Sequence, residues 1–330
     1  MRLIRLAATF GIIRADDNAS KELGKGIDLR KTNLLGDFQE RQASVFASLP
    51  SDCFIKKTLH YSGSNFDYFA STKQFYQKMA IGAGLDASLE SAFTLGATLS
   101  SLIQKADSNE TQVSGISLNI QTITEKILVQ KDCLYDDQIS SSTKHFVRDL
   151  ERLPLTFEKP WLANSWKAYS VFLETYGSHV ITSVKRGSSI RQATFAESSS
   201  SYSQRDFQVK SCLELAGPTN VAKVGVKACA KISKSEISKA TKMKTVDKLI
   251  IRGGTKETCN ALYKQRTEDL IEKLLNEAGE TDAAVEHTFI SMWGILQSRF
   301  GIGSENYIRA VNLQYDYLGF LNYGCQFKEI

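Results

Sequence analysis

A serine directly followed by a histidine, Ser178-His179, is the pair in this 330-residue chain whose types could carry out nucleophilic catalysis. A histidine can take the proton of a hydroxyl, but a hydrolase also needs an acid that orients the imidazole. No acidic residue follows in a triad-like arrangement, and the chain has no Gly-x-Ser-x-Gly motif. We therefore expect His179 to be a hydrogen-bonded structural residue and the protein not to be an enzyme.

Six cysteines and four histidines could offer metal ligands, but they are scattered along the chain and no Cys-x-x-Cys motif occurs. A zinc site is therefore not expected, and nothing in the sequence calls for a cofactor. An even, dispersed set of cysteines fits a secreted protein with up to three disulfides, whose pairing the sequence does not fix. The alternative is six reduced thiols in the core.

The composition is that of a globular protein, with a net charge of +5 and a pI near 8.7. This mild basicity favours contact with an anionic surface but is too weak to predict nucleic-acid binding. No apolar run reaches the length of about 18 residues that a transmembrane helix needs. Residues 1–17 have a basic start and a short apolar run, which is typical of a signal peptide, and an N-terminal extension is the alternative.

The elements that must position these residues are strands and helices without a βαβ rhythm. Residues 53–59, 66–69, 180–195 and 249–251 are predicted strands, and residues 140–153, 165–174 and 257–277 are predicted helices. Residues 114–130 are rich in β-branched side chains, and their apolar positions change from even to odd after Ile120, which predicts one long strand with a bulge. The pattern predicts an α+β fold around an antiparallel sheet.

The segment from Ala222 to Ile232 fits two structures at once. It alternates apolar and polar residues, as a strand does, yet apolar residues from Val226 to Ala240 also recur at steps of three and four, as in a helix. A second segment, Leu89 to Ile103, has the same double pattern. The positions that would form the apolar face of the strands are Leu89, Phe93, Leu95 and Leu99 in one segment and Ala222, Val224, Val226, Ala228, Ala230 and Ile232 in the other.

One explanation is that both structures are used at different times. The segments would fold as amphipathic helices in water and extend as strands in a membrane, where a tilted strand needs about 9–11 residues. Lipid tolerates strands only in a closed barrel, so several copies of the chain would have to assemble. The alternative is that the segments are ordinary half-exposed strands or surface helices.

The lysines Lys223, Lys227 and Lys231 alternate with the apolar positions of the second segment. In an extended strand they would line a basic lumen or meet lipid headgroups, whereas in a helix they would be a solvated face. Cys229 shares their phase. A disulfide from Cys229 to a distant cysteine would prevent the segment from extending, and a bridge to Cys212 would constrain it less.

The stretch from Tyr169 to Ser188 resembles the signature of the membrane attack complex/perforin (MACPF) family. Tyr169 is followed after six residues by Tyr176-Gly177-Ser178-His179, and Gly187 comes at the spacing of the family's glycine pair. Three positions depart from the pattern: Ser178 for Thr, Val180 for an aromatic residue and Ser188 for the second Gly. The double-pattern segments stand where the family has its two membrane-inserting clusters, and the phrase YGSHVITSVKRG is similar to perforin-like toxins of cnidarians.

The resemblance implies a bent, twisted four-stranded antiparallel sheet flanked by two helical clusters, within a MACPF domain over residues 18–330. Gly177 and Gly187 would lie near the bend, and Gly253 and Gly254 would form the glycine pair of a later strand. It further implies a secreted pore-forming protein that assembles as a homo-oligomeric ring on a lipid membrane and inserts two hairpins per subunit, without a cofactor or nucleic acid. The alternative is a non-lytic interaction protein on the same fold.

Overall fold

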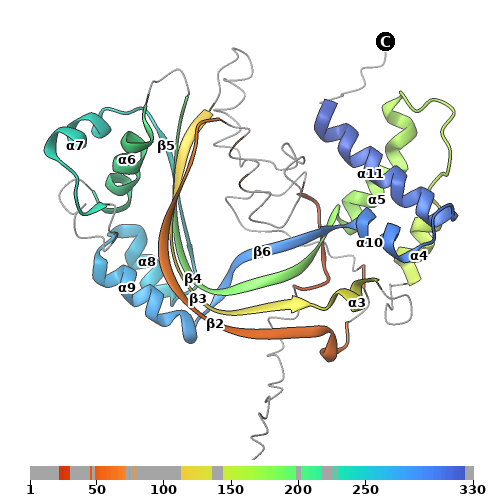
Figure 1. The fold of residues 1–330 in the computed structure, drawn as a ribbon, viewed down its shortest axis with the longest axis horizontal. Coiled ribbons are helices and arrows are strands. Elements are labelled where there is room, and N and C mark those ends of the chain that lie inside the picture. Colours follow the sequence, from red (N-terminus) through yellow and green to blue (C-terminus); the bar gives the residue numbers. More distant parts are fainter. Residues whose placement is uncertain are drawn as a thin grey trace, which may run out of the picture.

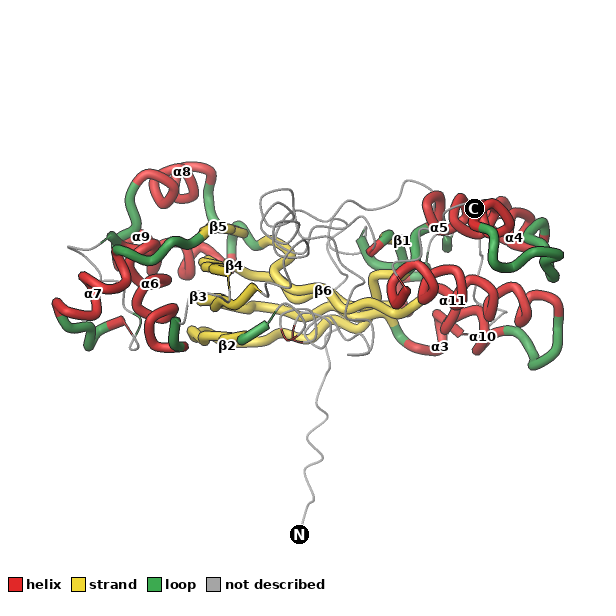
Figure 2. The backbone as a smooth tube through the Cα atoms, turned by 90° about the horizontal axis from the view of Figure 1, so that it is seen from above, coloured by secondary structure: helices red, strands yellow, loops and turns green. Residues whose placement is uncertain are grey.

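A computed structural model of the chain describes residues 22–29, 45–46, 49–71, 74, 78, 113–135, 144–197, 202–217, 226 and 229–323. In this part of the chain a long, bent antiparallel sheet connects two groups of helices (Figure 1). One group packs on the outer side of one limb of the sheet, and the other lies beyond the end of the second limb. Seen from above, the strands run side by side between these two helical ends (Figure 2).

Three long strands form the body of the sheet: β2 (Phe54–Phe69), β3 (Val113–Val129) and β4 (His179–Glu197). They pair as antiparallel neighbours in that order. The free edge of β4 is shared by two shorter strands, because β5 (Val246–Arg252) pairs with its later half and β6 (Ala283–Ser291) with its earlier half. The short strand β1 (Gly26–Ile27) pairs with the start of β4. The sheet is thus four strands wide over most of its length, as predicted.

The sheet bends along β4 where β6 gives way to β5 (Figure 1). Close to this point the pairing of β3 with β4 shifts between Ile123 and Glu125. The buried apolar side chains that face the two cores change phase across the shift, from Ile116, Leu118 and Ile120 before it to Ile127 and Val129 after it. The predicted long strand with one bulge is therefore confirmed, and the bulge supplies local twist where the sheet bends.

The prediction of two short strands over residues 53–59 and 66–69 was wrong, because β2 is continuous across the polar stretch between them. β2 lies at the edge of the sheet and pairs with β3 along most of its length. Its side chains are mostly exposed or half-buried, so the strand is held by its backbone ladder with little help from apolar burial. Alternation of apolar residues is therefore a poor guide to its extent.

The group of helices at one end of the sheet forms a lobe with its own apolar core. The disulfide Cys53–Cys133 ties the start of β2 to the first of these helices. Two predicted helices are confirmed with shifted bounds, over residues 144–151 and 167–176. The elements of the lobe are η2 (Ser51–Cys53), α3 (Lys131–Tyr135), α4 (Lys144–Glu151), η3 (Ala163–Trp166), α5 (Lys167–Tyr176), α10 (Met292–Arg299) and α11 (Glu305–Tyr323).

The second group of helices covers the outer face of the other limb, around a separate apolar core. It consists of α6 (Gln204–Ala216), α7 (Lys234–Thr241), α8 (Lys256–Lys264), α9 (Glu268–Asn276) and the turn η6 (Glu277–Gly279). The prediction of one helix over residues 257–277 was wrong, because the chain leaves the helix at Gln265 and starts again at Thr267. The Thr267 hydroxyl accepts the N–H of Leu270 and caps α9.

Candidate membrane-inserting region

Helices α6 and α7 occupy the connection between two strands that are already paired. The chain leaves β4 at Glu197, forms the two helices and returns to the sheet in β5 at Val246. Phe195 and Val246 are antiparallel partners at the mouth of this connection. The segment from 198 to 245, referred to here as the second cluster, is therefore the loop of a β-hairpin, whatever its own structure.

Helix α6 is buried on more than one side. Its apolar side chains pack against the sheet and against α7, and Phe207 also contacts the ring of Tyr68 on β2, with centroids 6.1 Å apart. All of its odd-numbered positions from Phe207 to Leu215 are buried, four of them apolar, and Lys210 and Cys212 between them are buried as well. Such a period of two distributes apolar residues around a helix, whereas on a strand it would gather them on one face. The amphipathic pattern of α6 is therefore that of a strand.

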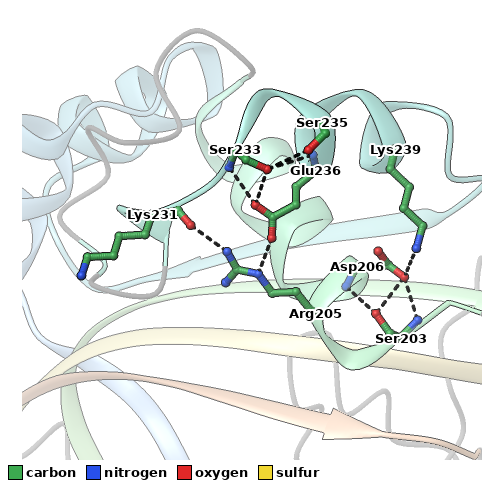
Figure 3. A network of polar contacts seen from close by, with 8 residues as sticks. All are labelled: Ser203, Arg205, Asp206, Lys231, Ser233, Ser235, Glu236 and Lys239. Carbon is green, nitrogen blue, oxygen red and sulfur yellow. Dashed lines mark hydrogen bonds and ion pairs between the residues drawn. The ribbon is translucent and has the colours of Figure 1, made fainter.

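A polar network on the surface holds α6 and α7 together (Figure 3). The Arg205 guanidinium donates to the Glu236 carboxylate at 2.8 Å and to the carbonyl oxygen of Lys231 at 2.8 Å. The Lys239 ammonium donates to the Asp206 carboxylate at 2.7 Å. Both helices begin with a capping box, a reciprocal pair of hydrogen bonds between side chains and backbone N–H groups. It joins Ser203 and Asp206 in α6, and Ser233 and Glu236 in α7. The same two carboxylates thus cap a helix and pair with the neighbouring one.

These contacts hold both carboxylates in the ionised form. Hydrogen bonds from Arg205 and from Ser233 lower the pKa of Glu236 to about 2. Burial would raise the pKa of Asp206, but the hydrogen bonds from Lys239 and Ser203 outweigh it and the pKa is lowered. A depressed pKa stabilises the folded form above the ordinary value of the carboxyl, and that stabilisation is lost as the pH falls toward the folded value. Acid should therefore loosen the contact between α6 and α7.

The change Glu236→Gln is expected to lower the thermal midpoint at pH 7, because it removes the ion pair with Arg205 and the ionised cap of α7. The gap between wild type and variant should narrow as the pH falls from about 4.5 toward about 2, where the wild-type carboxyl is itself protonated. Circular dichroism melts across this range measure the gap. Glu272→Gln, on the exposed face of α9, is the control, and a gap that stayed constant with pH would contradict the assignment.

The second cluster contains a disulfide, Cys212–Cys229, between α6 and the turn before α7. This is the bridge that the sequence pointed to as the less constraining one, since both cysteines belong to the segment that would extend. Cys259 has a free thiol, which donates to the carbonyl oxygen of Gly253. Cys325 lies outside the described residues.

The predicted membrane-inserting residues are described in part. Val226 is buried in the core under α6, Ala230 is exposed and Ile232 is half-buried. Lys231 is exposed in the turn before α7, and the helical structure begins only at Lys234. The residues Leu89, Phe93, Leu95, Leu99, Ala222, Lys223, Val224, Lys227 and Ala228 lie outside the described residues.

The two tyrosines of the signature lie on α5 and form hydrogen bonds to other segments of the lobe. The buried ring of Tyr169 places its hydroxyl to donate to the carbonyl oxygen of Pro154 at 2.6 Å and to accept from the amide of Asn312. Tyr176 donates to the Asp149 carboxylate at 2.7 Å, and burial together with this contact raises its pKa to about 12. Both side chains therefore tie neighbouring segments of the lobe to the helix that leads into β4.

Ser178 and His179 are sealed inside the molecule. The Ser178 hydroxyl lies 2.9 Å from Nδ1 of His179 and accepts the backbone N–H of Leu29 at 3.0 Å. Both side chains have no exposed surface, and the imidazole contacts the rings of Trp293 and Tyr317. Burial lowers the pKa of His179 to about 3, so it is neutral. The pair has the spacing of a nucleophile and its base but no access for a substrate, and its role is to join β4 to the lobe.

Glycines allow the strands to approach closely at the bend. A Cβ atom on Gly187 would lie 1.9 Å from the carbonyl oxygen of Thr122 on β3, and one on Gly253 would lie 2.4 Å from the carbonyl oxygen of Gly187. Gly254 follows at a φ of 76°. Gly177 is not at the bend: it ends α5 at a φ of 93°, and a Cβ there would lie 2.4 Å from the backbone nitrogen of Ile27. A glycine is therefore needed at position 177 so that the end of α5 can contact β1.

Among the described residues, no group of three or more His, Cys, Asp or Glu side chains is placed to hold a metal ion. In that same part of the chain, no helix combines the length and the apolar character needed to cross a membrane. Sequence reasoning missed the α6 half of the second cluster. The signal that indicates it is the alternation of apolar and polar residues from Phe207 to Leu215, which follows a polar stretch.

Comparison with known proteins agrees with this architecture. DELTA-alicitoxin-Pse2b from Phyllodiscus semoni is 35% identical over 309 residues, which cover 93% of this chain and 62% of the toxin. DELTA-thalatoxin-Avl2a from Actineria villosa is 36% identical over 307 residues, covering 92% of this chain and 61% of the toxin. The chain thus spans less than two thirds of the length of these relatives.

A similar fold occurs in GNIP1Aa from Chromobacterium piscinae, with a TM-score of 0.63 at 12% identity, covering 94% of this chain and 58% of that protein. The family model of the MAC/perforin domain matches residues 18–272. The predicted resemblance to the MACPF family is thereby confirmed, and the domain of this family is not an enzyme. The family model matches most of the chain, and the bent sheet with glycines at its bend agrees with it. The chain therefore belongs to the MAC/perforin (MACPF) family.

Proposed function

We propose that the chain is a pore-forming toxin that assembles as a ring on a target membrane and inserts two β-hairpins per subunit. The observation that supports this most directly is the position of the two segments with the double pattern, between strands that already pair. The second cluster connects β4 and β5, and residues 70–112 connect β2 and β3, so each joins strands that are already antiparallel neighbours. Extending either segment would lengthen an existing hairpin without a change of topology.

A closed barrel requires several subunits, because two hairpins leave open edges whose unpaired backbone groups are costly in lipid. The edge strand β2 has a row of exposed and half-buried residues that another subunit could pair with. The predicted inserting segments, Leu89 to Ile103 and Ala222 to Ile232, form part of this proposal. Lys223, Lys227 and Lys231 would then face the aqueous lumen or the lipid headgroups, with about 1 kcal/mol of attraction per lysine near an anionic surface.

Secretion is also part of the proposal. Two disulfides, Cys53–Cys133 and Cys212–Cys229, fit a protein that folds in an oxidising compartment. The relatives with about 35% identity carry toxin names, which agrees with an action outside the cell that makes them. We accordingly expect the target to be a membrane that the protein meets from outside.

Dye release from liposomes tests the proposal. The protein is expected to release an encapsulated dye, faster from vesicles that contain anionic lipid, because the chain is net positive. Electron microscopy of the same vesicles should show rings. If no lipid composition gives release or rings, the non-lytic interaction protein becomes the better description.

A further inference from the structure

The pairing of β4 with β5 has a constant register up to the mouth of the second cluster. It runs from Ser189 opposite Arg252 to Phe195 opposite Val246 without a shift. If this ladder continued, one residue forward from Phe195 would match one residue backward from Val246. Cys212 lies 17 residues beyond Phe195 (212 − 195), and Cys229 lies 17 residues before Val246 (246 − 229). The continued ladder therefore places the two cysteines directly opposite each other, and they are the two that the disulfide joins.

The disulfide geometry fits both arrangements of the chain. In the helical cluster the Cα atoms of Cys212 and Cys229 are 5.8 Å apart. Residues directly opposite each other in an antiparallel pair have Cα atoms about 4.5 to 5.5 Å apart. The two cysteines can thus stay bonded while the backbone around them changes from helix and turn to strand.

In the continued ladder, the side chains around the disulfide would separate into an apolar face and a polar face. The opposed pairs Val209–Ile232, Ser211–Ala230 and Leu215–Val226 would share one face, which is almost entirely apolar. The pair Lys210–Lys231 would lie on the other face, together with the disulfide itself. A slip of one residue between the two strands would put Lys210 opposite Ala230 or Ile232 and so break the separation into an apolar and a polar face, because side chains alternate with a period of two.

These agreements are independent of the helical packing. In the soluble form Val209, Ser211, Leu215 and Val226 are buried because the core beneath α6 surrounds them, and Lys210 pairs with Glu214 at 2.7 Å. Nothing in that packing requires the α6 residues and the Val226–Ile232 residues to match in register. The match is expected if the two stretches also meet as neighbouring strands.

We infer that the Cys212–Cys229 disulfide is a cross-strand staple that stays closed in the inserted hairpin and fixes its register. It assigns Lys210 and Lys231 to the face that lines the aqueous lumen, and Val209, Leu215, Val226, Ala230 and Ile232 to the face that contacts lipid. The inference rests on the proposed pore function. It excludes a role for this disulfide as a lock that must be reduced before insertion.

The first test follows the disulfide through insertion. Wild-type protein is added to dye-loaded anionic liposomes without reductant, and the membrane fraction is alkylated and digested for mass spectrometry. Full dye release with Cys212 and Cys229 still joined is the expected result. Release that begins only after reductant is added, or free thiols at both positions in the inserted protein, would overturn the staple while leaving the pore function intact. No release under either condition would remove the pore function and the staple together.

The second test reads the face of each side chain. Ala230 and Lys231 are neighbours and both are exposed in the soluble form, so cysteine at either position can be labelled with little disturbance. In a background with Cys259→Ser and Cys325→Ser, an environment-sensitive dye is attached to Ala230→Cys or Lys231→Cys. On insertion the dye at 230 should shift to the blue and be quenched from the lipid phase, and the dye at 231 should be quenched by iodide. The reverse assignment in leaking vesicles would contradict the register.

Discussion

A short covalent bridge between α6 and the end of α8 is expected to abolish dye release. Glu214 and Lys264 line one cleft of about 430 Å³ between these elements, so cysteines at the two positions can be joined by a short bis-maleimide. In an extended hairpin Glu214 would lie 17 residues beyond the end of β4 (214 − 197), or roughly 55 Å at about 3.3 Å per residue. A short linker cannot span that distance, so the bridged second cluster would stay folded.

Matched controls distinguish the effect of the covalent bridge from the effects of the substitutions and of the reagent. Each single variant treated with the same reagent, and the double variant labelled at both sites with a mono-maleimide, should release dye at nearly the wild-type rate. All variants carry Cys259→Ser and Cys325→Ser so that the reagent meets only the introduced thiols. Unimpaired release by fully bridged protein would mean that permeabilisation does not require α6 to extend.

Replacing Gly187 by alanine should destabilise the whole fold. The added Cβ would lie 1.9 Å from the carbonyl oxygen of Thr122 and 2.9 Å from its carbonyl carbon, both backbone atoms of the adjoining strand. They cannot retreat without breaking the β3–β4 ladder, so we expect the free energy of unfolding to fall by more than about 3 kcal/mol. The thermal midpoint should drop by roughly 5 °C or more.

Gly301 offers the comparison for this change. A Cβ there would meet no atom within 4 Å, so Gly301→Ala should leave the thermal midpoint nearly unchanged. Calorimetry or circular dichroism on both variants gives the result. Equal thermal midpoints for Gly187→Ala and wild type would contradict the prediction, because they would mean that β3 and β4 are far enough apart at the bend to accept a Cβ atom.

The sheet could be predicted where burial decides the structure. The change of the apolar positions from even numbers up to Ile120 to odd numbers such as Ile127 predicted the bulge of β3, because both halves of that strand face a core. The edge strand β2 was underestimated, because its ladder with β3 holds residues that no apolar pattern marks. The break between α8 and α9 had a visible signal in Thr267 and the acidic residues after it, which cap α9.

The candidate site was harder to predict, since its meaning depends on pairing. The alternation from Ala222 to Ile232 is visible in the sequence, and so is that of α6. Neither shows which residue of one stretch would oppose which residue of the other. That follows only once Phe195 is known to pair with Val246 and Cys212 with Cys229. Disulfide connectivity and strand register are relations between distant residues, and composition along one segment does not encode them.

The described part of the molecule keeps two apolar cores that do not merge, one in the lobe and one under α6 to α9. The long strands cross from one to the other, but each core closes around its own set of helices. We expect these two cores to unfold as separate cooperative units, although they share a backbone ladder. One half can therefore melt and reorganise while the other stays native. If the second cluster extends on a membrane as proposed, this separation confines the loss of native structure to the half that changes.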